Sequence, residues 1–85
     1  MEWDIKTQEK FKLMISKMPV FHRRIAEEAV TLKAQENAKA RGAAAVSEAD
    51  VISALFSDVT KPFYSLMIRL LEDVKFDYRK HGFPK

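Results

Sequence analysis

Few side chains in this sequence are of the types that perform chemistry, and their spacing does not group them. The two histidines, His22 and His81, lie far apart, and neither has a metal-ligating partner three or four residues away. The absence of cysteine excludes disulfides, thiolate catalysis and cysteine-ligated zinc. Ser47 lacks a neighbouring base or oxyanion turn, and we interpret it as a helix cap. The sequence therefore predicts no catalysis of its own, no metal site and no cofactor.

A block of basic residues, His22-Arg23-Arg24, opens a long amphipathic run. One interpretation is an anion-binding cluster near a helix start, where backbone N–H groups point outward. The other is a solvated cluster in which Arg23 pairs with Glu27 and Arg24 pairs with Glu28, each four residues further on. We favour the second interpretation and keep both arginines as candidate contacts for a ligand or partner.

The composition is that of one small folded domain. Of the 85 residues, 47% are hydrophobic and 32% are charged, and a chain of this size builds only a small core. The N-terminus lacks the pattern of a signal peptide, and no apolar run approaches the roughly 20 residues that span a bilayer. We therefore expect a cytoplasmic protein with no membrane partner. Because a small core limits stability, self-association as a homodimer is an expected supplement.

The net charge of +3 is concentrated at one end of the chain. Residues 1–74 contain 11 basic and 11 acidic residues, so their charges cancel. Residues 75–85 contain four basic residues and one acidic residue, which accounts for the whole excess. A basic tail is a weaker indication of nucleic-acid binding than a basic face on the fold.

Hydrophobic spacing predicts an all-α fold, a compact bundle of about four helices around one long central helix. The first helix is expected over about residues 7–17. The central helix is expected over about residues 19–41, from Pro19 to a stop at Gly42. No run of alternating residues supports a strand, except for a few residues around Val46.

Two short helices are expected to follow the central one. Ser47 and Asp50 have the spacing of a capping box at the start of the third helix. The fourth helix, over about residues 63–74, has the cleanest amphipathic pattern. For the central helix, we expect one apolar stripe to face the core. This stripe consists of Phe21, Ile25, Ala29 and Leu32.

The chain divides into a helical domain, residues 1–74, and a basic aromatic tail, residues 75–85. The apolar stripe of the fourth helix is core in one interpretation and a partner-binding face in the other, with Phe63 and Met67 as candidate interface residues. The tail either folds back over the core or presents aromatic and basic side chains to a partner. Its candidate contacts are Tyr78, Arg79 and Lys80.

Residues 1–56 resemble a helical module found at the C-terminus of the B subunit of light-independent protochlorophyllide reductase. The resemblance rests on Trp3 ahead of the first helix, the Met18-Pro19 step, Phe21 and Arg23, Ala38 one turn before Gly42, and the Val46-Ser47 pair. Residues 57–74 are then an extra helix. The resemblance implies an accessory module near a tetrapyrrole site, without iron–sulfur chemistry of its own. Our candidate contacts for a ligand or partner are Pro19, Phe21, Arg23, Arg24 and Arg41.

A weaker similarity is to the histone fold, in which a long middle helix lies between two short ones. Here the residues from Val46 to Val51 would form the loop and start of the third helix. The cations that would then contact phosphates are Lys12, Lys17, Arg23, Arg24 and Arg41. The neutral balance of residues 1–74 argues against strong DNA binding, because that affinity depends on the number of phosphates neutralised.

Together these observations favour a non-catalytic helical interaction module, acting through contacts with a protein or a tetrapyrrole-like ligand. The alternative hypothesis is a dimeric, histone-like nucleic-acid-binding protein. Within the first hypothesis, a protein partner or a second copy of the chain is the expected partner, and nucleic acid is the second choice.

Overall fold

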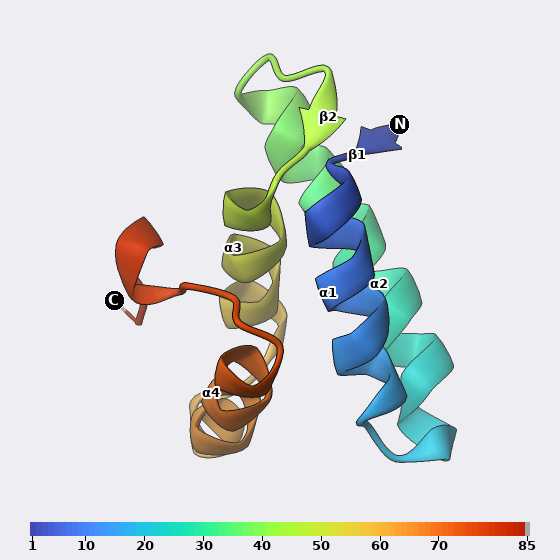
Figure 1. Ribbon diagram of the computed structural model, residues 1–85, viewed down its shortest axis with the longest axis vertical. Helices are drawn as coiled ribbons and strands as arrows, with labels where there is room; N and C mark the ends of the chain where they lie inside the picture. Colours follow the sequence, from blue (N-terminus) through green and yellow to red (C-terminus); the bar gives the residue numbers. More distant parts are fainter. Residues whose placement is uncertain (85) are drawn as a thin grey trace.

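The computed structural model describes residues 1–84, and these residues form four α-helices joined by short connections (Figure 1). The elements in chain order are β1 (Glu2–Trp3), α1 (Ile5–Ser16), α2 (Val20–Ala40), β2 (Ala45–Val46), α3 (Glu48–Asp58), the 3₁₀ turn η1 (Lys61–Phe63), α4 (Tyr64–Asp73) and the 3₁₀ turn η2 (Arg79–His81). The predicted all-α fold is confirmed. Lys85, the last residue of the predicted tail, lies outside the described residues.

The first helix begins two residues earlier than the spacing predicts, because Asp4 caps it. An Asp4 carboxylate oxygen accepts hydrogen bonds from the Thr7 backbone N–H, at 3.0 Å, and from the Thr7 hydroxyl, at 2.9 Å. These bonds favour the charged carboxylate and lower the pKa of Asp4. Thr7 is thereby satisfied in a buried position.

The long central helix α2 ends as the sequence predicts. Gly42 adopts a φ of +72°, which other residues adopt only with strain. The Gly42 N–H donates to the Lys39 carbonyl and the Ala43 N–H donates to the Ala38 carbonyl, at 3.0 and 2.9 Å. This pair of bonds is the Schellman motif, which satisfies carbonyls at a helix end. The chain then returns through β2 into α3.

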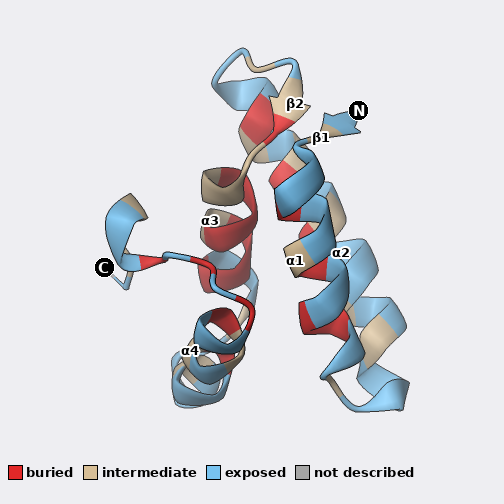
Figure 2. Ribbon diagram, viewed as in Figure 1, coloured by how far each residue is buried: buried red, intermediate tan, exposed pale blue. Residues whose placement is uncertain are grey.

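The apolar stripe predicted to face the core from α2 faces solvent instead, so this prediction is wrong. Phe21, Ile25 and Leu32 are exposed by 77%, 68% and 61%, whereas the residues that face the core are Val30, Ala34 and Ala38. The reason is steric: alanine side chains let α3 lie close against α2, and the larger residues of the stripe do not. The exposed and buried faces of α2 are visible in Figure 2.

Helix α3 lies at the centre of the core. Val51, Ile52 and Ala54 are fully buried, and Leu55 is nearly so. α3 packs mainly against α2, with α1 beside it, and Figure 2 shows it as the most continuously buried helix. The sequence predicts a bundle around the long helix α2, but the helix enclosed by its neighbours is the shorter α3.

The two short strands tie the N-terminus to the connection before α3. Glu2 and Trp3 pair in parallel with Ala45 and Val46, which agrees with the expectation of a short strand near Val46. The ring of Trp3 stacks on Phe11 of α1, with 5.5 Å between centroids. Trp3 therefore acts as an anchor of the chain terminus on the core.

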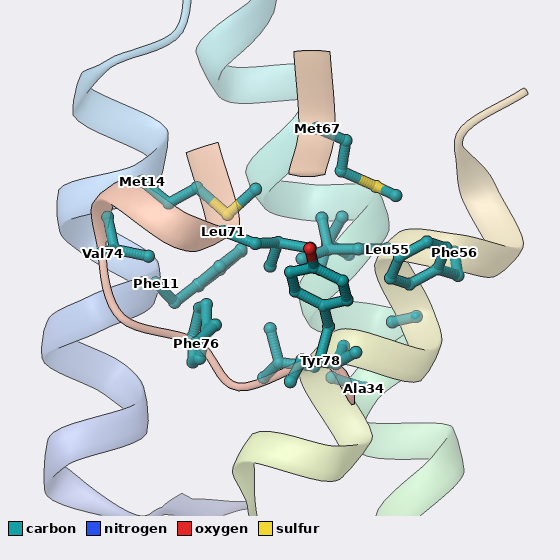
Figure 3. Packing of buried hydrophobic residues seen from close by; sticks show 14 of the residues in the cluster. Phe11, Met14, Ala34, Leu55, Phe56, Met67, Leu71, Val74, Phe76 and Tyr78 are labelled. Carbon is teal, nitrogen blue, oxygen red and sulfur yellow. The ribbon is translucent and has the colours of Figure 1, made fainter. Parts of the chain in front are cut away.

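The segment after α4 folds back over the core. Phe76 and Tyr78 are 2% and 5% exposed, and both belong to the same buried cluster as Met14, Leu55 and Leu71 (Figure 3). The fold-back interpretation of the tail is confirmed for these two residues. The predicted boundary at residue 75 therefore separates segments that share one core.

Candidate functional site

Arg23, a predicted ligand or partner contact, holds two helices together. Its Nε donates to the Met18 carbonyl at 2.9 Å, and its Nη2 donates to the Ser16 carbonyl at 2.8 Å. These carbonyls lie at the end of α1, where a helix has no intrahelical donors left. The guanidinium therefore caps α1 from the first turn of α2. The predicted pairing of Arg23 with Glu27 is replaced by this backbone contact.

Arg24, in contrast, makes the predicted pair with Glu28. The Arg24 Nε lies 3.1 Å from a Glu28 carboxylate oxygen. Both side chains are largely exposed to solvent, so the pair contributes little to stability. Pro19, next to this block, occupies the N-cap position of α2, and Phe21 projects outward from the first turn.

Arg41, another predicted contact, forms a two-pronged ion pair with Asp50. Its Nε lies 2.9 Å from Oδ1 of Asp50, and its Nη2 lies 2.7 Å from Oδ2. The same Nη2 reaches the Ser47 hydroxyl at 3.1 Å. Asp50 is only 3% exposed. The guanidinium thus closes the connection between α2 and α3, and most of its donors are used within the chain.

The charge state of Asp50 is set by opposing effects. Burial raises the pKa of the Asp50 carboxyl, but the hydrogen bonds from Arg41 and from the Ser47 backbone and hydroxyl outweigh burial and lower it overall. The hydrogen bond to Asp50 likewise raises the pKa of Arg41. The Ser47 N–H donates to Asp50 Oδ2 at 2.9 Å, so the capping box predicted from the sequence is present.

Two of the predicted interface or tail contacts lie inside the core rather than on the surface. Met67 is 4% exposed and Tyr78 is 5% exposed (Figure 3). The Tyr78 hydroxyl donates to a Glu72 carboxylate oxygen at 3.0 Å. Both assignments are corrected, because the α4 stripe and the tail close the core from one side. A partner cannot reach Tyr78 without unfolding that side, and it can reach Met67 only at the floor of a groove.

The other three predicted interface or tail contacts remain at the surface. Phe63 is 59% exposed. Arg79 lies over the ring of Tyr78, with 5.6 Å between the guanidinium carbon and the ring centroid. The Lys80 side chain is exposed, and its backbone N–H donates to Asp77. Within residues 1–84, the hydrogen bonds of the Arg23 and Arg41 side chains go to other residues than these three.

A polar cluster that the sequence pattern did not reveal attaches the tail to the helices. The Lys10 ammonium lies 3.1 Å from a Glu48 carboxylate oxygen and donates to the Lys75 carbonyl at 2.9 Å. The other Glu48 oxygen lies 3.3 Å from the His81 ring. Lys10 also lies over the ring of Phe76. The cluster joins α1, α3 and the tail, and sequence spacing carries no signal of it.

A second unpredicted feature is an apolar groove of about 460 Å³ between the first half of α2 and α4. Its floor includes the buried side chains of Met14, Leu55 and Met67, and its rim includes Ile25, Phe63 and Leu66. Ala26 and Ala29 of α2 leave the space open. The signal that could have revealed it is the presence of small residues on α2 beside large ones on α4.

Beside the groove, Phe21 and Leu32 are exposed on the outer side of α2 and do not line it. We call this whole surface the apolar face and define it by five large exposed residues. They are Phe21, Ile25, Leu32, Phe63 and Leu66. Their exposed fractions lie between 59% and 77%. An α-helix with apolar residues on both its inner and outer sides is typical of a helix that is covered on both sides.

Fold and surface together define a small helical protein with a closed polar connection at one end of α2 and an open apolar face at the other. Among residues 1–84, no helix combines the length and apolar character needed to cross a membrane. Comparison with protein-family models, with curated proteins and with solved structures gives no match.

Proposed function

We propose that this chain is a non-catalytic helical interaction module that binds another protein surface through its apolar face. The observation that carries the proposal is the exposure of five large apolar side chains, of which Ile25, Phe63 and Leu66 line an apolar groove. At about 200 Å² for a large apolar side chain, these five expose roughly 650 Å². The largest patch on a typical monomer is about 300–600 Å², and larger patches mark interaction sites.

The positions of the charged residues support a protein partner over nucleic acid. Arg23 and Arg41 direct their donors to groups within the chain, so two of the five cations assigned to phosphate contacts are already engaged. Phosphate binding draws its affinity from cations that are free to displace counterions. Arg24 remains exposed beside Glu28. The histone-like hypothesis is tested by a gel shift at two salt concentrations, and we expect no salt-dependent retardation.

A small-molecule function of the same groove is the second candidate. Its volume of about 460 Å³ lies within the roughly 300–1,000 Å³ of ligand sites. His22, which lines the groove, supplies an imidazole at its edge. The resemblance to the protochlorophyllide reductase module makes a tetrapyrrole-like ligand the one to test. Titration with a chlorophyll precursor should shift its absorbance with the wild-type chain and not with His22→Ala, if this candidate holds.

The main proposal is tested by affinity capture with matched baits. The wild-type chain and an Ile25→Glu, Leu66→Ser variant are presented to a lysate of the source organism. A second bait, Leu13→Ser, carries a change on α1 outside the groove lining. We expect one partner protein to bind the wild-type and Leu13→Ser baits and not the double variant. When this partner is purified and mixed with the purified wild-type chain, the two should again form a complex. If every captured protein binds all three baits equally, the proposal is wrong.

A further inference from the structure

We propose that the occupant of the apolar face is a second copy of this chain, paired through α2 around a two-fold axis near Ala29. This inference rests on the proposed function, because it names the partner of the same surface. It commits to one arrangement, in which the outer side of α2 faces the outer side of α2 in the other copy.

The first support is that the apolar face contains both projections and a recess. Ile25 and Leu66 stand at the rim, and the groove lies between them. A two-fold interface uses the same patch on both partners, so that patch must complement itself. A surface with only projections or only a groove would need a different partner. On this surface, the projecting side chains of one copy can enter the groove of the other copy, and the reverse.

The second support is the spacing along α2. Ile25, Ala29 and Leu32 lie on one side of the helix, and Ala29 is exposed between the two larger residues. If two α2 helices run antiparallel, Ile25 of one lies near Leu32 of the other and the two alanines lie near the axis. Helices pack with axes about 8–10 Å apart, and a small residue at the crossing permits the closer distance.

The third support is the area. The five residues of the apolar face expose roughly 650 Å² per copy at about 200 Å² for a full side chain. The groove walls add to this. A stable interface buries about 800 Å² per partner. One copy therefore presents about the area that a stable dimer requires.

The fourth support is the charge distribution. Residues 1–74, which include α2 and α4, contain equal numbers of basic and acidic residues. The excess positive charge is in the tail, and η2 lies on the side of α3 away from α2 (Figure 1). Two copies meeting through α2 are therefore not driven apart by net charge. Glu28, beside the contact, is neutralised by Arg24 of its own chain.

Disulfide trapping tests the arrangement directly, because the chain has no native cysteine. We expect Ala29→Cys to form a covalent dimer under mild oxidation, since two copies of residue 29 lie near the axis. The matched control, Leu13→Cys, places a half-exposed cysteine on α1 and should remain monomeric after the same oxidation, as judged on a non-reducing gel. Equal trapping of both variants would overturn the proposed arrangement.

Sedimentation equilibrium tests the affinity. Leu32→Glu should raise the dimer dissociation constant by roughly a hundredfold or more, because a dimer would bury an unpaired carboxylate in each copy. Phe63→Ser should also weaken it, and Leu13→Ser should not. Circular dichroism checks that each variant keeps its helical content. A dimer that survives Leu32→Glu and Phe63→Ser contacts elsewhere, which overturns the inference.

The inference and the proposed function fail in different ways. If the wild-type chain is monomeric at several hundred micromolar, no second copy covers the apolar face and the inference is wrong. In that case the capture experiment still decides the proposed function. Loss of a captured protein with the Ile25→Glu, Leu66→Ser bait would retain the function with a different partner.

Discussion

The two ends of α2 differ in how their side chains are satisfied. At its C-terminal end, Gly42 turns the chain, the half-exposed Arg41 pairs with the buried Asp50, and small residues pack against α3. At its N-terminal end, Phe21 and Ile25 project into solvent beside an apolar groove. One end satisfies its polar groups within the chain, and the other leaves apolar area uncovered.

This difference shows which part of a small protein carries stability and which part is left for contact. The closed end uses bonds whose partners are all within a few residues of the α2–α3 connection. At the open end, burial of the large apolar side chains would be favourable, but no part of residues 1–84 covers them. Changes at the two ends should therefore have effects of different kinds, on unfolding at one end and on association at the other.

The largest effect on unfolding is expected for Asp50→Ala at the closed end. It removes the ion pair with Arg41 and the capping box with Ser47 together. Arg41 is half-exposed and can be solvated afterwards, so we expect a loss of about 3 kcal/mol rather than the upper end of the range for buried pairs. Urea denaturation measures it. The control, Glu28→Ala, breaks an exposed pair and should change stability by less than about 0.5 kcal/mol. Equal losses would remove the distinction between the two pairs.

The inner face of α2 should be nearly as sensitive to added volume. Ala34 is completely buried, so Ala34→Leu should destabilise the fold by about 2 kcal/mol through overpacking. Ala40→Leu, at an exposed position of the same helix, is the matched control and should have little effect. Thermal unfolding of both variants measures the difference. If Ala34→Leu is tolerated as well as the control, close packing of α2 against α3 is not what fixes the direction of α2.

The closed end should also be the acid-sensitive end. The pKa of Asp50 is lower in the folded chain than its ordinary value of 3.8. Its contribution to stability is therefore complete above that ordinary value and is lost as the pH falls through the lower folded value. The wild-type free energy of unfolding should fall on acidification below about pH 4, and Asp50→Asn should show a shallower fall. Parallel slopes for the two proteins would exclude Asp50 as a source of the acid sensitivity.

The smallest effects concern the backbone at two helix ends. Gly42 has φ of +72° and no atom near the position of an added Cβ, so Gly42→Ala should cost about 1 kcal/mol from backbone strain alone.

Lys75 follows α4 with φ of +66°, and the Phe76 N–H donates to the Leu71 carbonyl as at the end of α2. Lys75→Gly should stabilise the fold by about 0.5 kcal/mol, because relief of strain exceeds the entropy that glycine adds to the unfolded chain. The denaturation midpoint should fall for Gly42→Ala and rise for Lys75→Gly relative to the wild-type chain.

Local signals accounted for most of the helical architecture. The Ser47–Asp50 spacing, the stop at Gly42 and the break at Pro19 act over a few residues, so the sequence shows them directly. The candidate site was harder to predict from the sequence. Arg23 and Arg41 look alike as exposed cations in the sequence, yet both contact groups that come near only after the helices pack. Met67 and Tyr78 likewise become inaccessible only when α4 and the tail close over the core.

By itself, the sequence determined most of the helix ends, because caps, prolines and glycines act on their immediate neighbours. Only the tertiary structure decided which side of α2 is inside. A stripe of Phe21, Ile25 and Leu32 and a stripe of Val30, Ala34 and Ala38 are both compatible with helical periodicity. The choice between them depends on how closely α3 can approach, and that depends on side-chain volume across the contact rather than on hydrophobicity along the chain.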